Sequence, residues 1–173
     1  MLTEIATRRP DWSLVLVGID KVREPGNRRL LDQLAARNNV HLLGNKTTEE
    51  LALYPRHFDV CIMPYLRNAY TRYIYPLKLH EYLASGRPIV GTPIDALLEY
   101  RNLLSLATTA DEWIVAVEAE LAGRSPASAE TRIATASRHD WSILTRRVAE
   151  TIATRLGEAH RLPLEAIPVE HVA

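Results

Sequence analysis

The sequence has very few of the residues that build the commonest special sites. Its 173 residues include one cysteine, Cys61, and one phenylalanine, and no apolar run approaches the length of about 20 residues that a membrane span needs. A single cysteine cannot form an internal disulfide or a thiolate cluster, and it is typical of a reducing compartment. The six histidines lack the spacing of zinc ligands. We therefore expect no metal site.

Net charge is also missing. Lys and Arg total 21, and Asp and Glu total 21 as well, so there is no overall basic field that would attract nucleic acid. The N-terminal residues lack the apolar core of a signal peptide. With 47% hydrophobic and 24% charged residues, the composition is that of a globular domain. These features predict a cytoplasmic protein without a nucleic-acid partner.

Several catalytic motifs are absent too. The sequence contains no Gly-x-Ser-x-Gly elbow, no Gly-x-Gly-x-x-Gly turn and no phosphate-loop lysine motif, which leaves hydrolase, dehydrogenase and NTPase readings without support. His139-Asp140-Trp141 contains two residue types used in catalysis. An ordinary explanation is that Asp140 caps a helix and that Trp141 packs beneath it.

Short apolar runs alternate with helical patterns along the chain. The apolar runs lie at 13–18, 40–44, 59–64, 89–92 and 103–107. The helical patterns lie at 2–9, 27–37, 47–54, 76–85, 96–100, 111–121, 129–138 and 141–160. This alternation predicts an α/β, doubly wound parallel sheet with extra C-terminal helices. We expect a Rossmann-like domain at 1–161 and a flexible tail at 162–173.

Helix boundaries follow from capping residues and apolar spacing. Asn27 is expected to cap the second helix, with Leu30, Leu31 and Leu34 facing inward. Asp111 is expected to cap the helix that begins near it, with Trp113, Val117 and Leu121 among its inward residues.

The segment from Tyr75 to Thr92 carries the clearest functional signal. It predicts a helix with Pro76 at its first position, a left-handed end at Gly86 and a buried strand. Lys78 lies in the first turn, where the helix dipole disfavours a cation by about 0.3–1 kcal/mol. Lys78 and Glu81 can address one anionic ligand there, the lysine its phosphates and the glutamate a hydroxyl group. The ordinary alternative is an exposed Lys–Glu pair on an amphipathic helix.

The pattern P-x-K-x-x-E-Y-L-A-x-G-x-P-I-V in this segment resembles the donor-binding segment of GT-B glycosyltransferases of the group 1 family. The resemblance covers roughly Asp11 to Ala107 and implies the C-terminal, donor-binding half of that fold. It implies that the helix N-terminus holds a nucleotide-sugar diphosphate and that Glu81 binds the ribose, with the nucleotide sugar as substrate and no separate cofactor. The nucleotide-sugar-binding residues then expected are Gly18, Asn45, Tyr65, Thr71, Tyr73, Pro76, Leu77, Lys78 and Glu81.

Two departures from the family pattern bear on this reading. Many retaining members have a glutamate where this chain has Tyr73, so the catalytic residues and the stereochemistry stay open. The first strand of the fold, the basic diphosphate loop and the N-terminal acceptor-binding domain have no counterpart in the sequence, so we expect a fragment that is inactive alone. The strands at 14–17 and 60–63 then either pair directly or leave their edges open.

The sequence thus predicts the donor-binding half of a hexosyltransferase that acts in polysaccharide or cell-envelope glycan synthesis. A non-catalytic nucleotide-sugar-binding module and a nucleotide-sugar epimerase-like domain are alternatives. Arginines in the C-terminal helices form either an ordinary solvated face or a surface for peripheral contact with anionic lipid.

Overall fold

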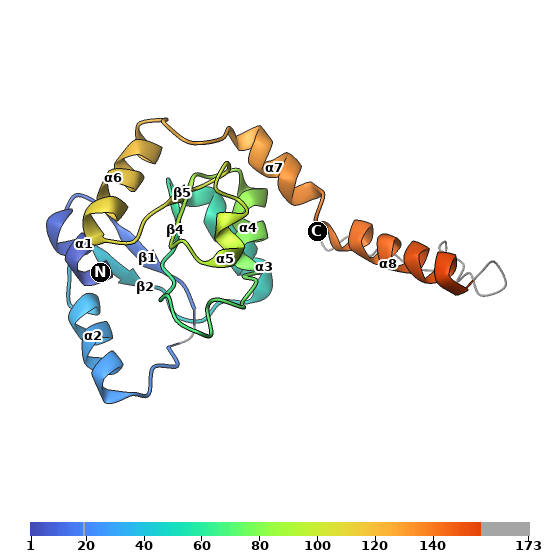
Figure 1. Ribbon diagram of the computed structural model, residues 1–173. Helices are drawn as coiled ribbons and strands as arrows, with labels where there is room; N and C mark the ends of the chain where they lie inside the picture. Colours follow the sequence, from blue (N-terminus) through green and yellow to red (C-terminus); the bar gives the residue numbers. More distant parts are fainter. Residues whose placement is uncertain (19, 157–173) are drawn as a thin grey trace.

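The computed structural model describes residues 1–18 and 20–156, in which helices and parallel strands alternate (Figure 1). The strands are β1 (Leu14–Leu16), β2 (Val40–Leu42), β3 (Cys61–Met63), β4 (Ile89–Gly91) and β5 (Ser105–Leu106). The helices are α1 (Leu2–Arg8), α2 (Pro25–Ala35), α3 (Thr48–Leu53), the 3₁₀ helix η1 (Tyr54–His57), α4 (Lys78–Ser85), α5 (Asp95–Leu98), α6 (Ala110–Leu121), α7 (Ala129–Ser137) and α8 (Trp141–Leu156). The predicted order of elements is confirmed, and the predicted tail at 162–173 lies outside the described residues.

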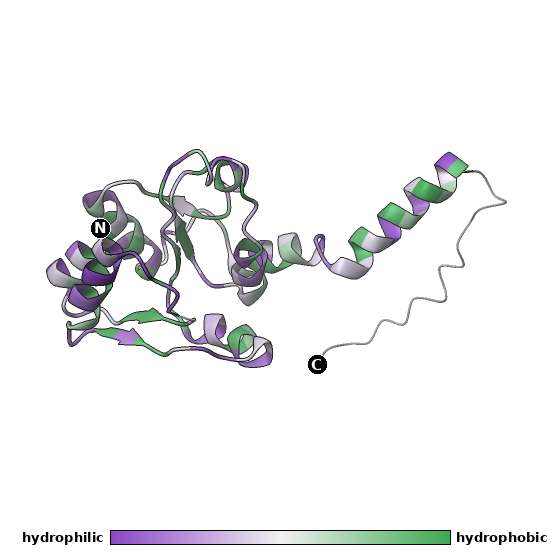
Figure 2. Ribbon diagram, turned by 90° about the horizontal axis from the view of Figure 1, so that it is seen from below, coloured by the Kyte–Doolittle hydropathy of each residue, from purple (hydrophilic) through white to green (hydrophobic). Residues whose placement is uncertain are grey.

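The strands form two separate parallel sheets. β1 pairs with β2, and β3, β4 and β5 pair in that order. Val15 lies opposite His41 in the first sheet, and Ile62 lies opposite Val90 in the second. The two groups of strands stand apart in Figure 2. Of the two outcomes expected for β1 and β3, the structure has the one in which the two strands do not pair with each other.

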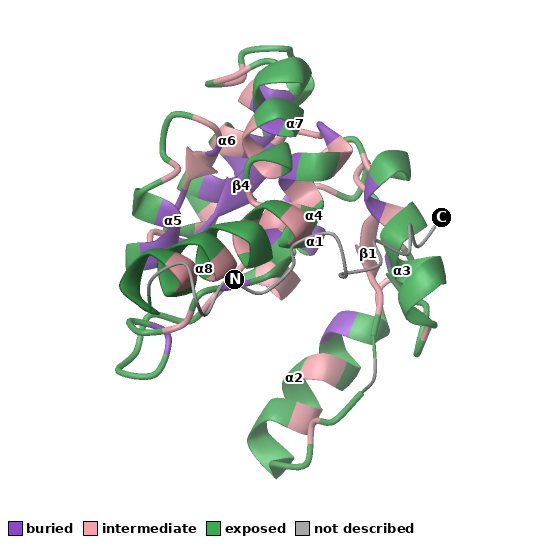
Figure 3. Cartoon of the chain, turned by 90° about the vertical axis from the view of Figure 1, so that its right-hand side faces the viewer, coloured by how far each residue is buried: buried purple, intermediate pink, exposed green. Residues whose placement is uncertain are grey.

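The core lies around β4, whose residues are all buried (Figure 3). Ile89 packs in a cluster that contains Leu79 and Leu83 of α4. Val90 packs on the other face, in a cluster that contains Trp113 of α6. Because successive strand residues point to opposite faces, β4 is covered by α4 on one side and α6 on the other.

α1 and Asn39 hold the smaller sheet in place. The side-chain amide of Asn39 donates to the backbone carbonyls of Ala6, Arg9 and Trp12, at 3.0, 3.1 and 3.0 Å. Arg9 also forms an ion pair with Glu118 of α6. These contacts fasten α1 both to the strand β2, which begins next to Asn39, and to the helix that covers β4.

Two helix starts differ from those predicted. α2 begins at Pro25, which suits the first helical position because the helix requires no N–H there, so Asn27 is not its cap. α6 is capped by Thr109, which exchanges hydrogen bonds with Glu112 in a capping box. This exchange satisfies two backbone donors, and Asp111 lies instead in the first turn.

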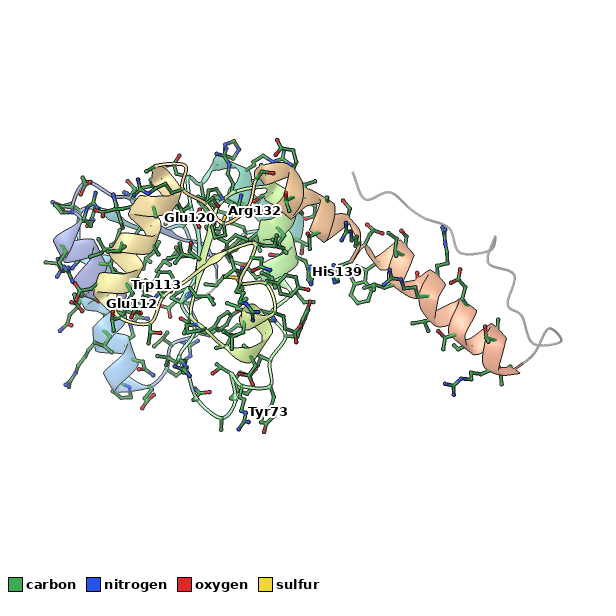
Figure 4. The ribbon with its side chains drawn as sticks, turned by 45° about the horizontal axis from the view of Figure 1, so that its top comes forward. Tyr73, Glu112, Trp113, Glu120, Arg132 and His139 are labelled. Atoms are coloured by element: carbon green, nitrogen blue, oxygen red, sulfur yellow. The ribbon has the colours of Figure 1, made fainter. Side chains whose placement is uncertain are left out.

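Two inward-facing predictions are also wrong. Leu30 is 57% exposed and Leu121 is 49% exposed. In α6 the neighbouring Glu120 is buried instead, 3.9 Å from the guanidinium of Arg132 on α7. The buried charge pair lies at the top of Figure 4. The predicted face of α6 is otherwise confirmed, since Trp113 and Val117 are buried, and only its last turn buries Glu120 in place of Leu121.

α8 extends away from the rest of the chain (Figures 1 and 4). Asp140 caps it as predicted, because its carboxylate accepts the Ser142 N–H at 2.8 Å. Trp141, predicted to pack below the cap, is instead 72% exposed. Within the described ranges, no helix combines the length and the apolar character needed to cross a membrane.

Candidate functional site

The N-terminus of α4 is open. The helix starts at Lys78, and the residue before it, Leu77, supplies no side-chain cap and is 66% exposed. Pro76 precedes the first helical residue by two positions, where its carbonyl accepts the Leu79 N–H at 3.0 Å. The prediction that Pro76 is the first helical residue is therefore wrong by two residues, while the prediction that Lys78 lies in the first turn is confirmed.

Lys78 and Glu81 are both exposed on this first turn. The described residues show no ion pair between them, and the Lys78 ammonium lies instead 5.6 Å from the centre of the Tyr82 ring. Burial raises the pKa of Tyr65, and the nearby negative charge of Glu81 raises it further. The site thus places an unneutralised cation and an unneutralised carboxylate beside two tyrosines.

The loop between β3 and α4 is held in shape by Thr71. This side chain is 6% exposed, and its hydroxyl donates to the Leu66 carbonyl at 2.5 Å. Asn68 and Thr71 also exchange hydrogen bonds between side chain and backbone, both at 2.9 Å. The predicted ligand-binding residue Thr71 is therefore occupied by contacts within the loop, and its neighbours carry the exposed groups.

Tyr73 lies at the exposed edge of the same loop, as Figure 4 shows. Tyr73 is 81% exposed, and the Arg72 guanidinium lies 5.6 Å from the centre of its ring. The position predicted to face the sugar is therefore free to contact a ligand.

A pocket of about 360 Å³ lies between this loop and the segment that follows β4. Arg67 and Arg72 line it together with Asp95, and Arg72 approaches Asp95 to 3.7 Å. The sequence reading did not single out these two arginines, because the loop lacks a periodic pattern. Both arginines follow a buried strand, and this position could have identified them, since ligands of parallel sheets bind at the carboxyl ends of the strands.

The remaining predicted residues lie at the ends of β1 and β2. The Gly18 N–H donates to the Gly44 carbonyl at 2.9 Å, and Gly44 has a left-handed φ of 67° that favours glycine. Asn45 is exposed beside them. The structure thus brings Gly18 and Gly44 together, but in the part of the chain that it describes no hydrogen bond joins them to α4. The described residues also contain no group of three or more potential metal ligands.

Known proteins give a consistent picture of the family. Residues 1–122 match the family model described as glycosyl transferases group 1. A protein of Bacillus subtilis (strain 168), TuaH, whose proposed role is that of a teichuronic acid biosynthesis glycosyltransferase, is 37% identical over 92 residues. This match covers 53% of the chain and 22% of TuaH, so the chain spans less than a quarter of that relative.

Two solved structures share the fold. Anabaena Alr3699/HepE, crystallised in complex with UDP, matches 88% of this chain and 44% of its own, with a TM-score of 0.62 and 18% identity. The pneumococcal O-GlcNAc transferase GtfA, in complex with UDP and GlcNAc, matches 90% of this chain over 32% of its own length, with a TM-score of 0.57 and 15% identity. The predicted family and fold class are confirmed, and the chain belongs to the glycosyl transferases group 1 family.

Proposed function

We propose that this chain is the donor-binding part of a nucleotide-sugar-dependent glycosyltransferase, a hexosyltransferase that acts in polysaccharide or cell-envelope glycan synthesis. Family membership supports the transfer of a sugar, and the name of TuaH supports an envelope polymer. The UDP in the two structural relatives supports a nucleoside diphosphate as the ligand. The nucleotide sugar is the substrate, and the proposal requires no further cofactor.

The open N-terminus of α4 is the observation that carries the proposal. The side chains of Thr47, Thr109 and Ser128 close the N-termini of α3, α6 and α7. No side chain closes those of α1, α2, α4 and α5, and among these four α4 is the one that begins with a lysine. Its unused backbone donors and Lys78 suit a diphosphate, which accepts hydrogen bonds and carries charge.

The chemistry follows from these groups. In a glycosyl transfer, negative charge grows on the diphosphate as it leaves the sugar, and donors fixed in advance stabilise that charge. Lys78 and the first turn of α4 supply this stabilisation in the proposal, and Arg67 or Arg72 adds a second cation. Glu81 accepts hydrogen bonds from the ribose hydroxyls, and exposed Tyr73 contacts the sugar.

Binding of UDP by the purified chain tests the proposal. Isothermal titration should show one site, and Lys78→Ala should weaken UDP by about 1–3 kcal/mol, since it removes a charge-assisted hydrogen bond. Lys78→Arg should retain most of the affinity. Glu81→Gln should weaken UDP more than inorganic pyrophosphate, because pyrophosphate has no ribose.

Arg124→Ala is the matched control, because it removes the same charge from an exposed residue beyond the end of α6. It should bind UDP as the wild type does. Equal weakening by Lys78→Ala and Arg124→Ala would mean that overall charge alone governs binding and would reject the site. The competing class, a non-catalytic module, predicts UDP binding without sugar transfer even when the chain is part of its complete parent protein.

A further inference from the structure

The pocket that Arg67 and Arg72 line has an uncompensated positive charge. Its lining contains these two arginines and a single carboxylate, that of Asp95. Within the described residues, Arg67 forms no ion pair and Arg72 forms one, with Asp95 at 3.7 Å. One positive charge is therefore left without a partner in a hollow of about 360 Å³.

The ion pair between Arg72 and Asp95 is loose. Its separation of 3.7 Å exceeds the roughly 2.7–3.2 Å of a direct N–H···O hydrogen bond, and the two side chains are 67% and 66% exposed. Water screens the attraction within such an exposed pair, so the pair contributes little to stability. A ligand can therefore bond to both partners without breaking a strong contact.

The backbone around the pocket is fixed by bonds that involve no ligand. On one wall, the Thr71 hydroxyl donates to the Leu66 carbonyl, and Thr71 and Asn68 exchange two further hydrogen bonds. On the other wall, the Ile94 N–H donates to the Thr92 carbonyl at 2.7 Å, and Ile94 is buried. The charged side chains thus extend from a preformed frame, which lowers the cost of binding a small ligand.

Arg72 connects this pocket to the proposed position of the sugar. Its guanidinium lies 5.6 Å from the ring centre of Tyr73, at the exposed edge of the same loop (Figure 4). The proposed function places the sugar at Tyr73 and the diphosphate at Lys78, and it assigns at most one of the two arginines to the diphosphate. The other arginine is then free to bind a second anionic group, carried by a sugar.

The charges in the pocket match a carboxylate better than a phosphate. A phosphomonoester carries about −1.5 to −2 charges at pH 7, which exceeds the one unpaired positive charge and would be repelled by Asp95. A carboxylate carries one negative charge, and a guanidinium binds it through two parallel N–H bonds. Asp95 can in turn accept hydrogen bonds from sugar hydroxyl groups. A hexuronic acid offers both a carboxylate and hydroxyl groups.

We infer that this pocket binds the carboxylate of a hexuronic acid. Arg67 pairs with the carboxylate, and Arg72 and Asp95 bond to the adjacent hydroxyl groups. The inference rests on the proposed function and names the class of sugar that it leaves open. The acidic sugar is either the donor sugar or the sugar that accepts it, because the two must meet where the new bond forms.

Titration calorimetry with UDP-glucuronic acid and UDP-glucose tests the donor sugar. The acidic donor should bind about tenfold or more tightly than the neutral one, the scale of one charge-assisted hydrogen bond. Arg67→Ala should bring the two Kd values to within about twofold of each other, whatever its effect on UDP alone. Arg67→Lys should retain part of the preference, and Arg124→Ala, the exposed control beyond α6, should retain all of it.

Methyl glucuronide and methyl glucoside, titrated into the chain saturated with UDP, test the accepting sugar. If the carboxylate belongs to the acceptor, methyl glucuronide should bind more tightly than methyl glucoside, and Arg67→Ala should remove the difference. A preference for the acidic sugar in either titration supports the inference and identifies which sugar carries the carboxylate.

Equal affinity for acidic and neutral sugars in both titrations, with UDP bound normally, would overturn the inference and leave the proposed function intact. A preference that Arg67→Ala and Arg124→Ala reduce equally would reflect overall charge and would overturn it as well. Failure of the chain to bind UDP at all would reject the proposed function and, with it, the inference.

Discussion

At the scale of single residues, His80 is the most unusually placed titratable group near the candidate site. Its Nε2 lies 2.7 Å from the hydroxyl of Tyr75, and its ring centre lies 4.4 Å from that of His139. The Tyr75 hydroxyl also bonds the hydroxyl of Tyr100 at 2.7 Å. Burial lowers the pKa of His80, and repulsion from His139 lowers it further. This cluster ties α4 to the junction between α7 and α8.

Stability should therefore fall as the solution is acidified. Between the lowered folded pKa and the ordinary value near 6.5, the unfolded chain binds a proton at His80 that the folded chain does not. The stability that neutral His80 contributes is therefore fully present above a pH of about 6.5 and is lost as the pH falls through the pKa of His80 in the folded chain. Urea unfolding between about pH 7.5 and 5.5 should show this loss, and His80→Gln should flatten the curve.

His41→Gln provides the comparison, because His41 is exposed on β2. It should keep the pH dependence of the wild type. If both variants followed the wild-type curve equally, His80 would not be the group that links stability to pH. Other charges near the cluster, chiefly Glu99 beside Tyr100, remain in both variants and so cancel in the comparison.

At the scale of elements, α7 packs closely on the end of α4. Gly86 ends α4 with a left-handed φ of 72°, and a Cβ placed there would lie 3.1 Å from Ile133 Cδ1. The Gly86 carbonyl also accepts a hydrogen bond from buried Arg132 at 3.2 Å. One glycine thus permits the helix end, the close approach of α7 and a buried charge-assisted bond.

Gly86→Ala should lower the free energy of unfolding by about 2–5 kcal/mol, from backbone strain of roughly 1–2 kcal/mol and overpacking of roughly 1–3 kcal/mol. Gly123→Ala separates the two causes, because Gly123 has a similar φ of 73° and open space around its Cβ position. It should cost only about 1–2 kcal/mol. Denaturant unfolding measures both, and adding Ile133→Ala to Gly86→Ala should recover part of the steric loss. Equal losses of unfolding free energy at the two glycines would show that α7 moves aside for the added methyl group without a measurable loss of stability.

Local signals explain which elements were predictable. The left-handed end at Gly86 was predictable because it depends on residues within one turn. Thr109 was missed although it forms a capping box with Glu112, because Asp111 offered a competing cap. The sequence places Lys78 and Glu81 on the first turn for the same local reason.

Features that depend on distant contacts were not predictable. The burial of Glu120 requires Arg132 and Ser105, which lie on other elements. Thr71 was expected to bind a ligand, and nothing in the adjacent sequence shows that its hydroxyl is used within the loop. Arg67 was overlooked because its pocket forms only when the loop meets the segment after β4.

At the scale of the whole molecule, the two sheets differ in their protection from water. β3 and β4 are largely buried, whereas the residues of β1 are only half-buried and most of β2 is exposed. Within the described residues, β1 has a neighbouring strand on one edge only, whereas β4 has one on each edge.

The two sheets should open at different free energies. Exchange of the bonded amides of Leu14 and Leu43 should be at least about tenfold faster than that of Cys61 and Thr92. Few buried contacts hold the smaller sheet, and Asn39 supplies three hydrogen bonds to α1 and the segment that follows it. Hydrogen exchange measured by NMR on the free chain gives the ratio. Identical protection factors in both sheets would instead indicate one cooperative unit.

The single thiol described above has a consequence for chemistry on this chain. Cys61 lies in β3 with 1% of its surface exposed, and burial raises its pKa to about 12. Thiolate is the form that attacks labelling reagents, so the folded thiol is protected twice, by access and by protonation. Because the sequence has no other cysteine, the rate at which a maleimide or disulfide reagent modifies the protein reports how often β3 opens to solvent.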